Sequence, residues 1–299
     1  MLKYIIIVAL GALSFGMLSS FAKIAYGQGY TAAEITLTQA VAGSVILWAI
    51  VAIKSVKKDA TAFEMNWKLL GVGVTMGIST YTYYLSVQYI PASLAIVLLM
   101  QMTWMSILAE WVMFGKKPGA AELLASALII AGTLLAADVL HGLPAGFSIT
   151  GICLALFSAI MYTLFVLLTS NLGTKTPLFV KSALMTTGSA ITIAVINMKS
   201  LAASTQLDFG LLKWGGFLAL FGTVIPPVCF TIGMPKIGAG LSSILLTLEL
   251  PAAVFCAHII LGEEVSALQV CGMLLILSAI IYLNLLKVKK QSSVVVLAS

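Results

Sequence analysis

The sequence contains no arginine, and only 9% of its 299 residues are charged. A soluble domain usually carries about a quarter charged residues, so this chain has too few to cover a water-exposed surface. The four cysteines lie inside apolar runs and lack metal-ligand spacing, which excludes a disulfide framework and predicts no metal site. No phosphate loop and no nucleophile–base pair is present, so we expect neither an enzyme nor a bound cofactor.

All basic charge comes from lysine, and the net charge is +6. No basic segment is long enough, or sufficiently interleaved with aromatic residues, to form a nucleic-acid face, so we expect no nucleic-acid partner. If the N-terminus is cytoplasmic, the inner breaks between apolar runs hold every lysine except Lys23, Lys199 and Lys213. This bias follows the positive-inside rule and predicts that both termini are cytoplasmic.

Long apolar runs dominate the chain, which is 61% hydrophobic and has a mean hydropathy of +1.12. A membrane-spanning helix needs about 20 apolar residues. Ten segments meet this need: 4–26, 33–53, 69–89, 92–114, 120–138, 148–170, 177–197, 211–233, 239–261 and 266–286. The sequence therefore predicts an all-α membrane protein with ten transmembrane helices, multi-pass in a plasma membrane, such as a bacterial inner membrane.

The chain repeats itself at an offset of 147 residues. At this offset Ile90 matches Ile237, Leu98 matches Leu245, and Gly115 matches Gly262. Each half contains five of the expected helices. Because five crossings leave the chain on the opposite side of the membrane, the second half starts from that side and is inverted relative to the first. We therefore predict two inverted five-helix repeats, at 1–143 and 148–290, followed by a disordered tail at 291–299.

Several motifs of the second half resemble the EamA-type family of the drug/metabolite transporter superfamily. The chain reads IGAGLSS at 237–243, LELPAA at 248–253 and LGEE at 261–264, with weaker copies IPASL at 90–94 and FGKK at 114–117. The resemblance covers nearly the whole chain and implies a five-plus-five helix arrangement that carries metabolites. In the family's common pattern the glutamate and the proline are adjacent, whereas in this sequence Leu250 separates Glu249 from Pro251.

Glu249 is the main candidate for substrate chemistry. It lies near the centre of its predicted span, where an ionised side chain costs about 2.5–3.5 kcal/mol on insertion scales, and no cation is close in sequence. We expect it to act as a proton site or as the counter-charge of a cationic substrate. A structural carboxyl bonded to a neighbouring helix is the alternative. Met102 stands at the equivalent position of the first repeat, so the two halves differ at the midplane.

Other polar and aromatic side chains near the predicted midplane are candidates for the substrate-binding wall. They are Gln101, Thr103, Trp104, Tyr81, Tyr83, Tyr84, Ser14, Phe15 and Tyr162. Polar residues at this depth either line a pocket or join helices, and aromatic rings suit an amphipathic or quaternary-amine substrate. Pro226, Pro227 and Pro251 are predicted hinges or kinks. Lys23 and Glu34 are expected to form a surface pair.

The leading functional hypothesis is a secondary transporter of small organic metabolites that works by alternating access, coupled to protons or to exchange. The resemblance favours export of amino acids or related compounds. One alternative is uptake of a cationic or quaternary amine, and another, from a different class, is a helical membrane scaffold without transport. The expected partners are a small-molecule substrate and the lipid bilayer, and the pattern is compatible with a monomer.

Overall fold

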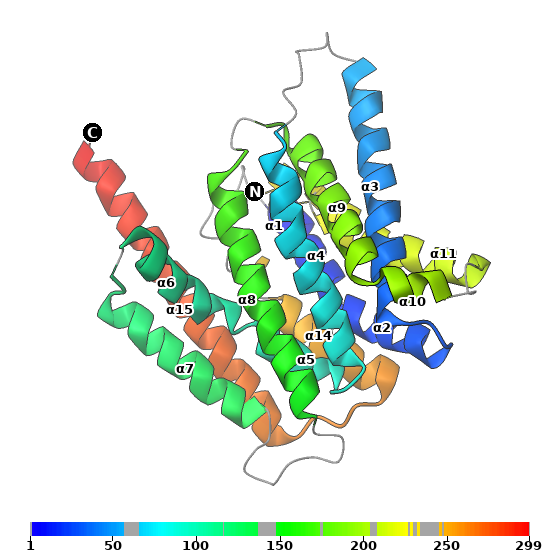
Figure 1. The fold of residues 1–299 in the computed structure, drawn as a ribbon. Helices are drawn as coiled ribbons and strands as arrows, with labels where there is room; N and C mark the ends of the chain where they lie inside the picture. Colours follow the sequence, from blue (N-terminus) through cyan, green and yellow to red (C-terminus); the bar gives the residue numbers. More distant parts are fainter. Residues whose placement is uncertain are drawn as a thin grey trace.

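A computed structural model describes residues 2–56, 66–115, 117–136, 148–173, 176–203, 208–226, 228–229, 232–233, 245–246 and 248–298. All regular secondary structure in these ranges is helical (Figure 1). Each of the ten predicted segments contains helix. By length and composition, helices at 2–27, 32–54, 92–113, 149–169 and 178–196 can cross a membrane, and shorter apolar helices lie at 120–136, 209–224, 249–261 and 267–282.

The first half begins with α1 (Leu2–Gly16) and α2 (Leu18–Gly27), which are separated by a turn at Met17. Helices α3 (Ala32–Val56) and α4 (Lys68–Val87) follow. Next come α5 (Ala92–Leu99), α6 (Met102–Phe114) and α7 (Ala120–Ala136).

The second half contains α8 (Ile149–Asn171), α9 (Leu178–Ile196), the short α10 (Met198–Ala203) and α11 (Phe209–Leu218). A π-helix, η2 (Ala219–Val224), continues α11, and α14 (Glu249–Leu261) and α15 (Ala267–Ala298) complete the chain. Residues 291–298, predicted as a disordered tail, therefore continue the last helix.

Local sequence signals explain where several helices begin. Before α3, the Thr31 backbone N–H donates to Glu34 Oε2 at 2.7 Å and the Glu34 N–H donates to Thr31 Oγ1, which forms a capping box. Ser148 and Asp208 cap α8 and α11 by accepting backbone N–H bonds three residues ahead. Pro91 and Pro177 stand immediately before α5 and α9. These caps satisfy donors that a helix leaves open at its start.

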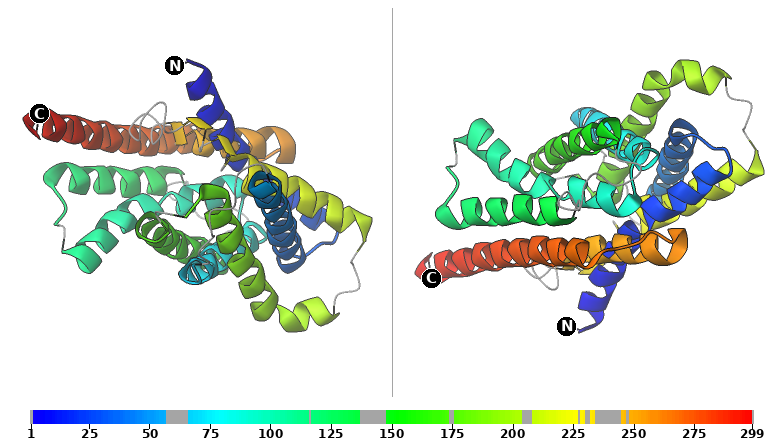
Figure 2. Two further views of the ribbon diagram at one scale, coloured as in Figure 1. Left: turned by 90° about the horizontal axis from the view of Figure 1, so that it is seen from above. Right: turned by 90° about the horizontal axis from the view of Figure 1, so that it is seen from below.

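Small residues let helices of the two halves pack closely. Helix α4 packs against α8 and α9, α3 packs against α9 and α11, and α7 packs against α15. A Cβ atom on Gly73 of α4 would lie 2.2 Å from the Met185 carbonyl oxygen of α9, and one on Gly132 of α7 would lie 2.8 Å from the Gly272 carbonyl oxygen of α15. Figure 2 shows α7 and α15 along one edge and α10 and α11 at the opposite end. Close backbone approach at glycine is typical of membrane helix pairs.

Burial follows a membrane pattern, with apolar side chains on the outside and small polar ones inside. Large apolar side chains such as Val45, Phe255 and Leu274 are exposed, whereas Thr36 and Ser158 are fully buried. Their hydroxyl groups donate to backbone carbonyl oxygens of Ala32 and Ser79. This distribution suits a lipid-facing exterior, where no surface needs to be polar.

Candidate functional site

Two helices break and restart at equivalent positions of the two repeats. The turn at Met100 and Gln101 separates α5 from α6, which starts at Met102, and α14 starts at Glu249. Helices α6 and α14 each have 13 residues, and each ends at a glycine with φ +67°, Gly115 or Gly262. Their starts and ends lie 147 residues apart, so the repeat offset predicted from the sequence describes the backbone as well. Discontinuous helices are common at transporter binding sites.

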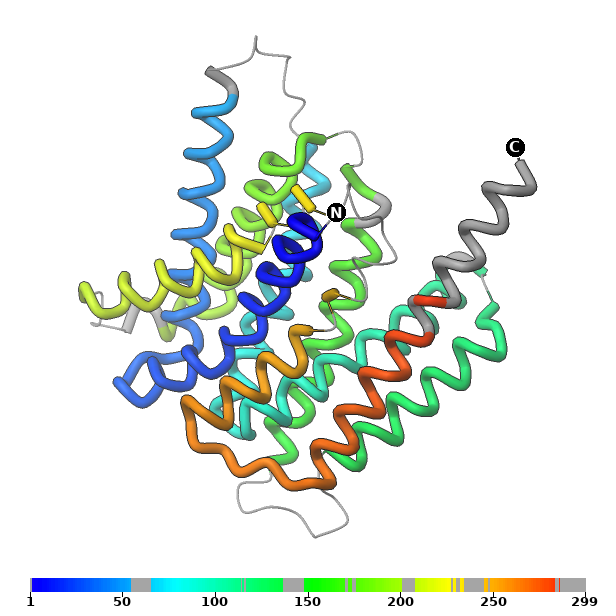
Figure 3. The backbone as a smooth tube through the Cα atoms, turned by 180° about the vertical axis from the view of Figure 1, so that it is seen from behind, coloured from blue at the N-terminus to red at the C-terminus, as the bar shows by residue number. Residues whose placement is uncertain are grey.

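A third break brings the first repeat against Glu249. Gly16 ends α1, and a Cβ atom there would lie 2.6 Å from both the Glu249 carbonyl oxygen and the Ala252 Cβ atom. Only glycine allows this approach without moving a helix. The α1–α2 break and the first turn of α14 are therefore in direct contact, as Figure 3 shows from behind.

Aromatic side chains from three helices surround the start of α14. Tyr83 of α4 and Tyr162 of α8 each interact electrostatically with Glu249. Trp104 of α6 packs on the same apolar cluster as Leu250. Within the described ranges, no lysine forms an ion pair with Glu249. This carboxyl group thus lies among aromatic rings at a helix start, and its charge has no fixed partner there.

Gln101 supports the aromatic wall instead of presenting a free amide. Its Nε2 donates to the Val97 carbonyl oxygen at 3.1 Å and to the Thr133 hydroxyl of α7, and its Oε1 accepts from Trp104 Nε1 at 2.8 Å. The side chain therefore holds the Trp104 ring in place. Thr103, in the first turn of α6, is half-buried.

The tyrosines of α4 divide between two clusters. Tyr83 faces the cluster of Glu249, whereas Tyr84 and Tyr81 pack with Phe15 in a second cluster between α2, α3, α4 and α11. Ser14 lies nearby and donates to the Phe221 carbonyl oxygen in η2. The site residues predicted from the sequence therefore form two adjoining groups.

The predicted hinge prolines have different settings. Pro251 is the third residue of α14, where its missing N–H costs no intrahelical bond. It is exposed and borders a groove of about 280 Å³ between α14 and α15. Pro226 is buried and helical, two residues after η2, and Pro227 lies outside the described residues.

Glu263 joins three segments at one end of the bundle, the lower end in Figure 1. Its Oε1 lies 2.9 Å from Lys23 Nζ of α2 and accepts the Ala92 N–H at 2.8 Å, and its Oε2 accepts from the Ser93 N–H and hydroxyl. We call this group the Glu263 clamp. Burial raises the pKa of Glu263, but the hydrogen bonds from Ser93, Ala92 and Lys23 outweigh it and hold that pKa below its ordinary value.

The clamp corrects one expectation. Lys23 pairs with Glu263 instead of Glu34, which accepts hydrogen bonds from Thr31 in the cap of α3. Sequence reasoning missed the Glu263 pair because 240 residues separate its partners. The signal that could have found it is the Gly–Glu sequence after α14, which lies at the same end of the bundle as Lys23.

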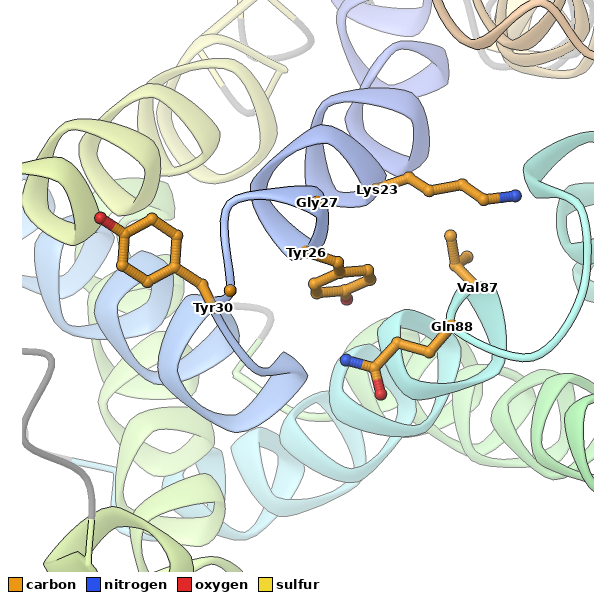
Figure 4. A pocket seen from close by; sticks show the side chains of 7 residues that line it. Lys23, Tyr26, Gly27, Tyr30, Val87 and Gln88 are labelled. Atoms are coloured by element: carbon orange, nitrogen blue, oxygen red, sulfur yellow. The ribbon is translucent and has the colours of Figure 1, made fainter.

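Further polar contacts occur at the same end. The Tyr30 hydroxyl donates to Asp208 at 2.8 Å, and Trp214 Nε1 donates to the Gln28 side chain at 2.6 Å. Hydrogen bonds from the Leu211 N–H and Tyr30 hold the pKa of Asp208 below its ordinary value, and the bond to Asp208 raises the pKa of Tyr30. A pocket of about 380 Å³ opens beside these loops, lined by Lys23, Tyr26 and Gln88 (Figure 4). This end of the bundle is therefore held together by several polar contacts.

The fold and the site together define a multi-pass membrane protein built from two inverted repeats around broken helices. The EamA-like transporter family matches residues 2–137 and again residues 149–285, two stretches that begin 147 residues apart. The chain belongs to this family, whose members are membrane transporters of small molecules.

A chain of known crystal structure supports the fold. It is 14% identical in sequence, with a TM-score of 0.62, and the match covers 93% of this chain and 96% of that chain. Among curated proteins, no sequence matches this chain significantly.

Proposed function

We propose that this protein is a secondary transporter that moves small organic metabolites by alternating access. In this proposal ten helices cross the membrane, both termini are cytoplasmic, and the repeats at 1–143 and 148–290 rock against each other. The two family matches and the equivalent starts of α6 and α14 support this arrangement, since inverted repeats commonly exchange their shapes around a midplane site.

The observation that carries the proposal is the position of Glu249. Its side chain belongs to the first residue of a helix that starts inside a predicted span, and it interacts with Tyr83 and Tyr162. A carboxyl group in this setting either carries a proton or pairs with a positive charge on the substrate. We assign Glu249 this role, with Trp104 as part of the wall and Gln101 as its support.

The proposed substrate carries an amino group, and export of amino acids or related compounds is the first candidate. A second candidate is uptake of a cationic or quaternary amine. It is favoured by the aromatic rings of Tyr83, Trp104 and Tyr162, which cluster near the start of α14, because aromatic faces attract cations.

The Glu263 clamp gives the proposal a conformational state. The lysine distribution predicts that this end of the bundle faces outward, and the clamp joins α2, α5 and the α14–α15 loop there. We propose that the structure represents a state closed to the outside, which opens when the clamp breaks. The membrane is a plasma membrane in this proposal, and the working partners are the substrate and the lipid bilayer.

The test is flux in proteoliposomes that contain the purified protein, with radiolabelled amino acids and amines, with and without a pH gradient. We expect Glu249→Gln to abolish coupled or exchange flux that the wild type supports. Glu110→Gln changes another half-buried carboxylate on α6 and serves as the control that keeps wild-type flux. If Glu249→Gln and the wild type behave alike, the role of Glu249 is wrong. A protein that neither transports nor is stabilised by any compound would support the scaffold alternative.

A further inference from the structure

Four buried polar atoms lack hydrogen-bond partners among the described residues. They are the hydroxyl oxygens of Ser19, Ser20 and Tyr84 and the side-chain oxygen Oε1 of Gln39. None of these residues is more than 6% exposed. An unsatisfied buried polar group is unfavourable, and each one in a native structure calls for an explanation. Four such groups on three neighbouring helices therefore need an explanation.

These atoms belong to one region of the first repeat. Ser19 and Ser20 are on α2, Gln39 is on α3 and Tyr84 is on α4, and α2 packs against both α3 and α4. The Gln39 and Tyr84 side chains lie close enough to interact, although neither Gln39 Oε1 nor the Tyr84 hydroxyl makes a hydrogen bond of good geometry. We call this group the polar cluster. Its unpartnered atoms are ones that a hydrogen-bonding group of a ligand can satisfy.

The polar cluster continues toward Glu249. Ser19 lies beside the Tyr83 side chain, and Tyr83 in turn interacts electrostatically with Glu249. On the other side, a Cβ atom on Gly222 of η2 would lie 3.0 Å from Gln39 Nε2. π-helices occur frequently at functional sites. Polar groups thus extend from the midplane carboxyl of the second repeat to the interior of the first.

The polar cluster also lies next to the pocket at the Glu263 end. Tyr26 lines that pocket, and its hydroxyl donates to the Tyr84 carbonyl oxygen at 2.9 Å. Figure 4 shows the Tyr26 ring between Lys23 and Gln88. Tyr26 therefore lies between the pocket and Tyr84, whose hydroxyl is unpartnered.

We infer that the polar cluster is a subsite for an uncharged hydrogen-bonding group of the substrate, a hydroxyl or a carboxamide. The three hydroxyl groups can donate or accept and Gln39 Oε1 can accept, so together they match a group that does both. Lys23, the lysine of α2, is paired with Glu263, so a substrate carboxylate would have to compete with Glu263 for that cation. The inference rests on the proposed function, in which the amino group of the same substrate lies at Glu249.

The first test needs no ligand and measures melting temperature in detergent. Without substrate, Tyr84→Phe and Ser20→Ala remove an unsatisfied oxygen, so we expect them to raise the melting temperature by about 2–4 °C. The matched controls remove hydroxyls that are bonded: Tyr26→Phe loses the bond to the Tyr84 carbonyl, and Ser79→Ala loses its bonds to Ser158. Both controls should melt lower than the wild type. If Tyr84→Phe and Ser20→Ala melt lower as well, their oxygens have structural partners and the inference is wrong.

The second test measures binding by thermal shift with three series of probes of equal chain length: n-alkylamines, ω-amino alcohols and ω-amino acids. We expect an amino alcohol to bind about threefold to tenfold more tightly than the alkylamine of the same length. Tyr84→Phe and Gln39→Leu should abolish this preference, so that the amino alcohol binds no more tightly than the alkylamine of the same length. Equal binding of amino alcohols and alkylamines would overturn the inference, because the cluster would then hold only water. Tighter binding of the ω-amino acids than of the ω-amino alcohols of equal length would overturn the inference too.

The two proposals fail in different ways. If Glu249→Gln leaves alkylamine affinity unchanged while the hydroxyl preference persists, the role of Glu249 is wrong and the polar cluster stands. If alkylamine binding needs Glu249 but no hydroxyl preference exists, the role of Glu249 stands and the polar cluster fails.

Discussion

Helices α6 and α14 have the same backbone plan and different chemistry. Each starts after a turn, has 13 residues and ends at a glycine with φ +67°. Yet Met102 begins α6 where Glu249 begins α14, and Gly115 precedes two lysines where Gly262 precedes two glutamates. The second repeat alone places a carboxyl group at the break and another at the end of the helix.

The comparison separates what the duplication requires from what the function requires. Helix breaks, glycine caps and close crossings must match in both halves, because both halves pack by the same rules. Charge need not match. Glu263 joins the second repeat to α2 and α5 of the first, and the four unpartnered polar atoms found among the described residues lie in the first. The repeats therefore share a scaffold and divide the chemistry.

The largest expected effect comes from moving the carboxyl group between repeats. The double variant Met102→Glu with Glu249→Met keeps one glutamate at a helix start but places it in α6. We expect flux in proteoliposomes to fall by about a hundredfold, because the amino group of the substrate loses its charge partner. Normal melting behaviour is the control for folding. Full transport by the exchanged protein would show that the two breaks are interchangeable.

The second effect concerns the clamp that only the second repeat supplies. Glu263→Ala removes the acceptor of Lys23, Ala92 and Ser93, so we expect it to destabilise the closed state by about 2–3 kcal/mol. Lys23→Met removes one partly exposed partner and should cost about 0.5–1 kcal/mol.

The readout for the clamp is labelling of Ser86→Cys by a membrane-impermeant maleimide in a background without native cysteines. Ser86 is fully buried near the end of α4, so labelling reports opening. We expect labelling to increase more in Glu263→Ala than in Lys23→Met. Unchanged labelling in both variants would mean that the clamp does not hold the closed state.

The third effect tests the scaffold that the repeats share. Gly73→Ala places a Cβ atom 2.2 Å from the Met185 carbonyl oxygen, so we expect a loss of about 1–3 kcal/mol in stability. Gly71, two residues earlier on α4, has nothing within 4 Å of an added Cβ. Gly71→Ala is therefore the matched control and should be neutral or stabilising by up to about 1 kcal/mol. Equal melting temperatures for the two variants would contradict the close α4–α9 crossing.

The smallest effect is the pH dependence of the clamp. The pKa of Glu263 is lower in the folded protein than its ordinary value of 4.5, so its contribution is present above that value and is lost as pH falls through the folded-state pKa. We expect the difference in melting temperature between wild type and Glu263→Ala to shrink between about pH 5 and pH 3. A difference that stays constant over this range would show that the charge of Glu263 is not involved.

The sequence by itself determined the scaffold of this protein. Helix positions follow from apolar runs, Ser148, Asp208, Pro91 and Pro177 mark helix starts, and the 147-residue offset predicted equivalent helix ends at Gly115 and Gly262. These are local or repeating signals, which a linear pattern carries. That ten helices cross the membrane and that both termini are cytoplasmic remain predictions.

Only the tertiary structure decided how polar side chains are used. Gln101 is occupied by Val97, Thr133 and Trp104, Lys23 pairs with Glu263, and the Ser20 and Tyr84 hydroxyls remain without partners among the described residues. Whether a buried polar group supports a helix or awaits a ligand depends on neighbours that are distant in sequence. In this protein those neighbours come from the other repeat or from other helices of the same repeat, and no apolar pattern specifies them.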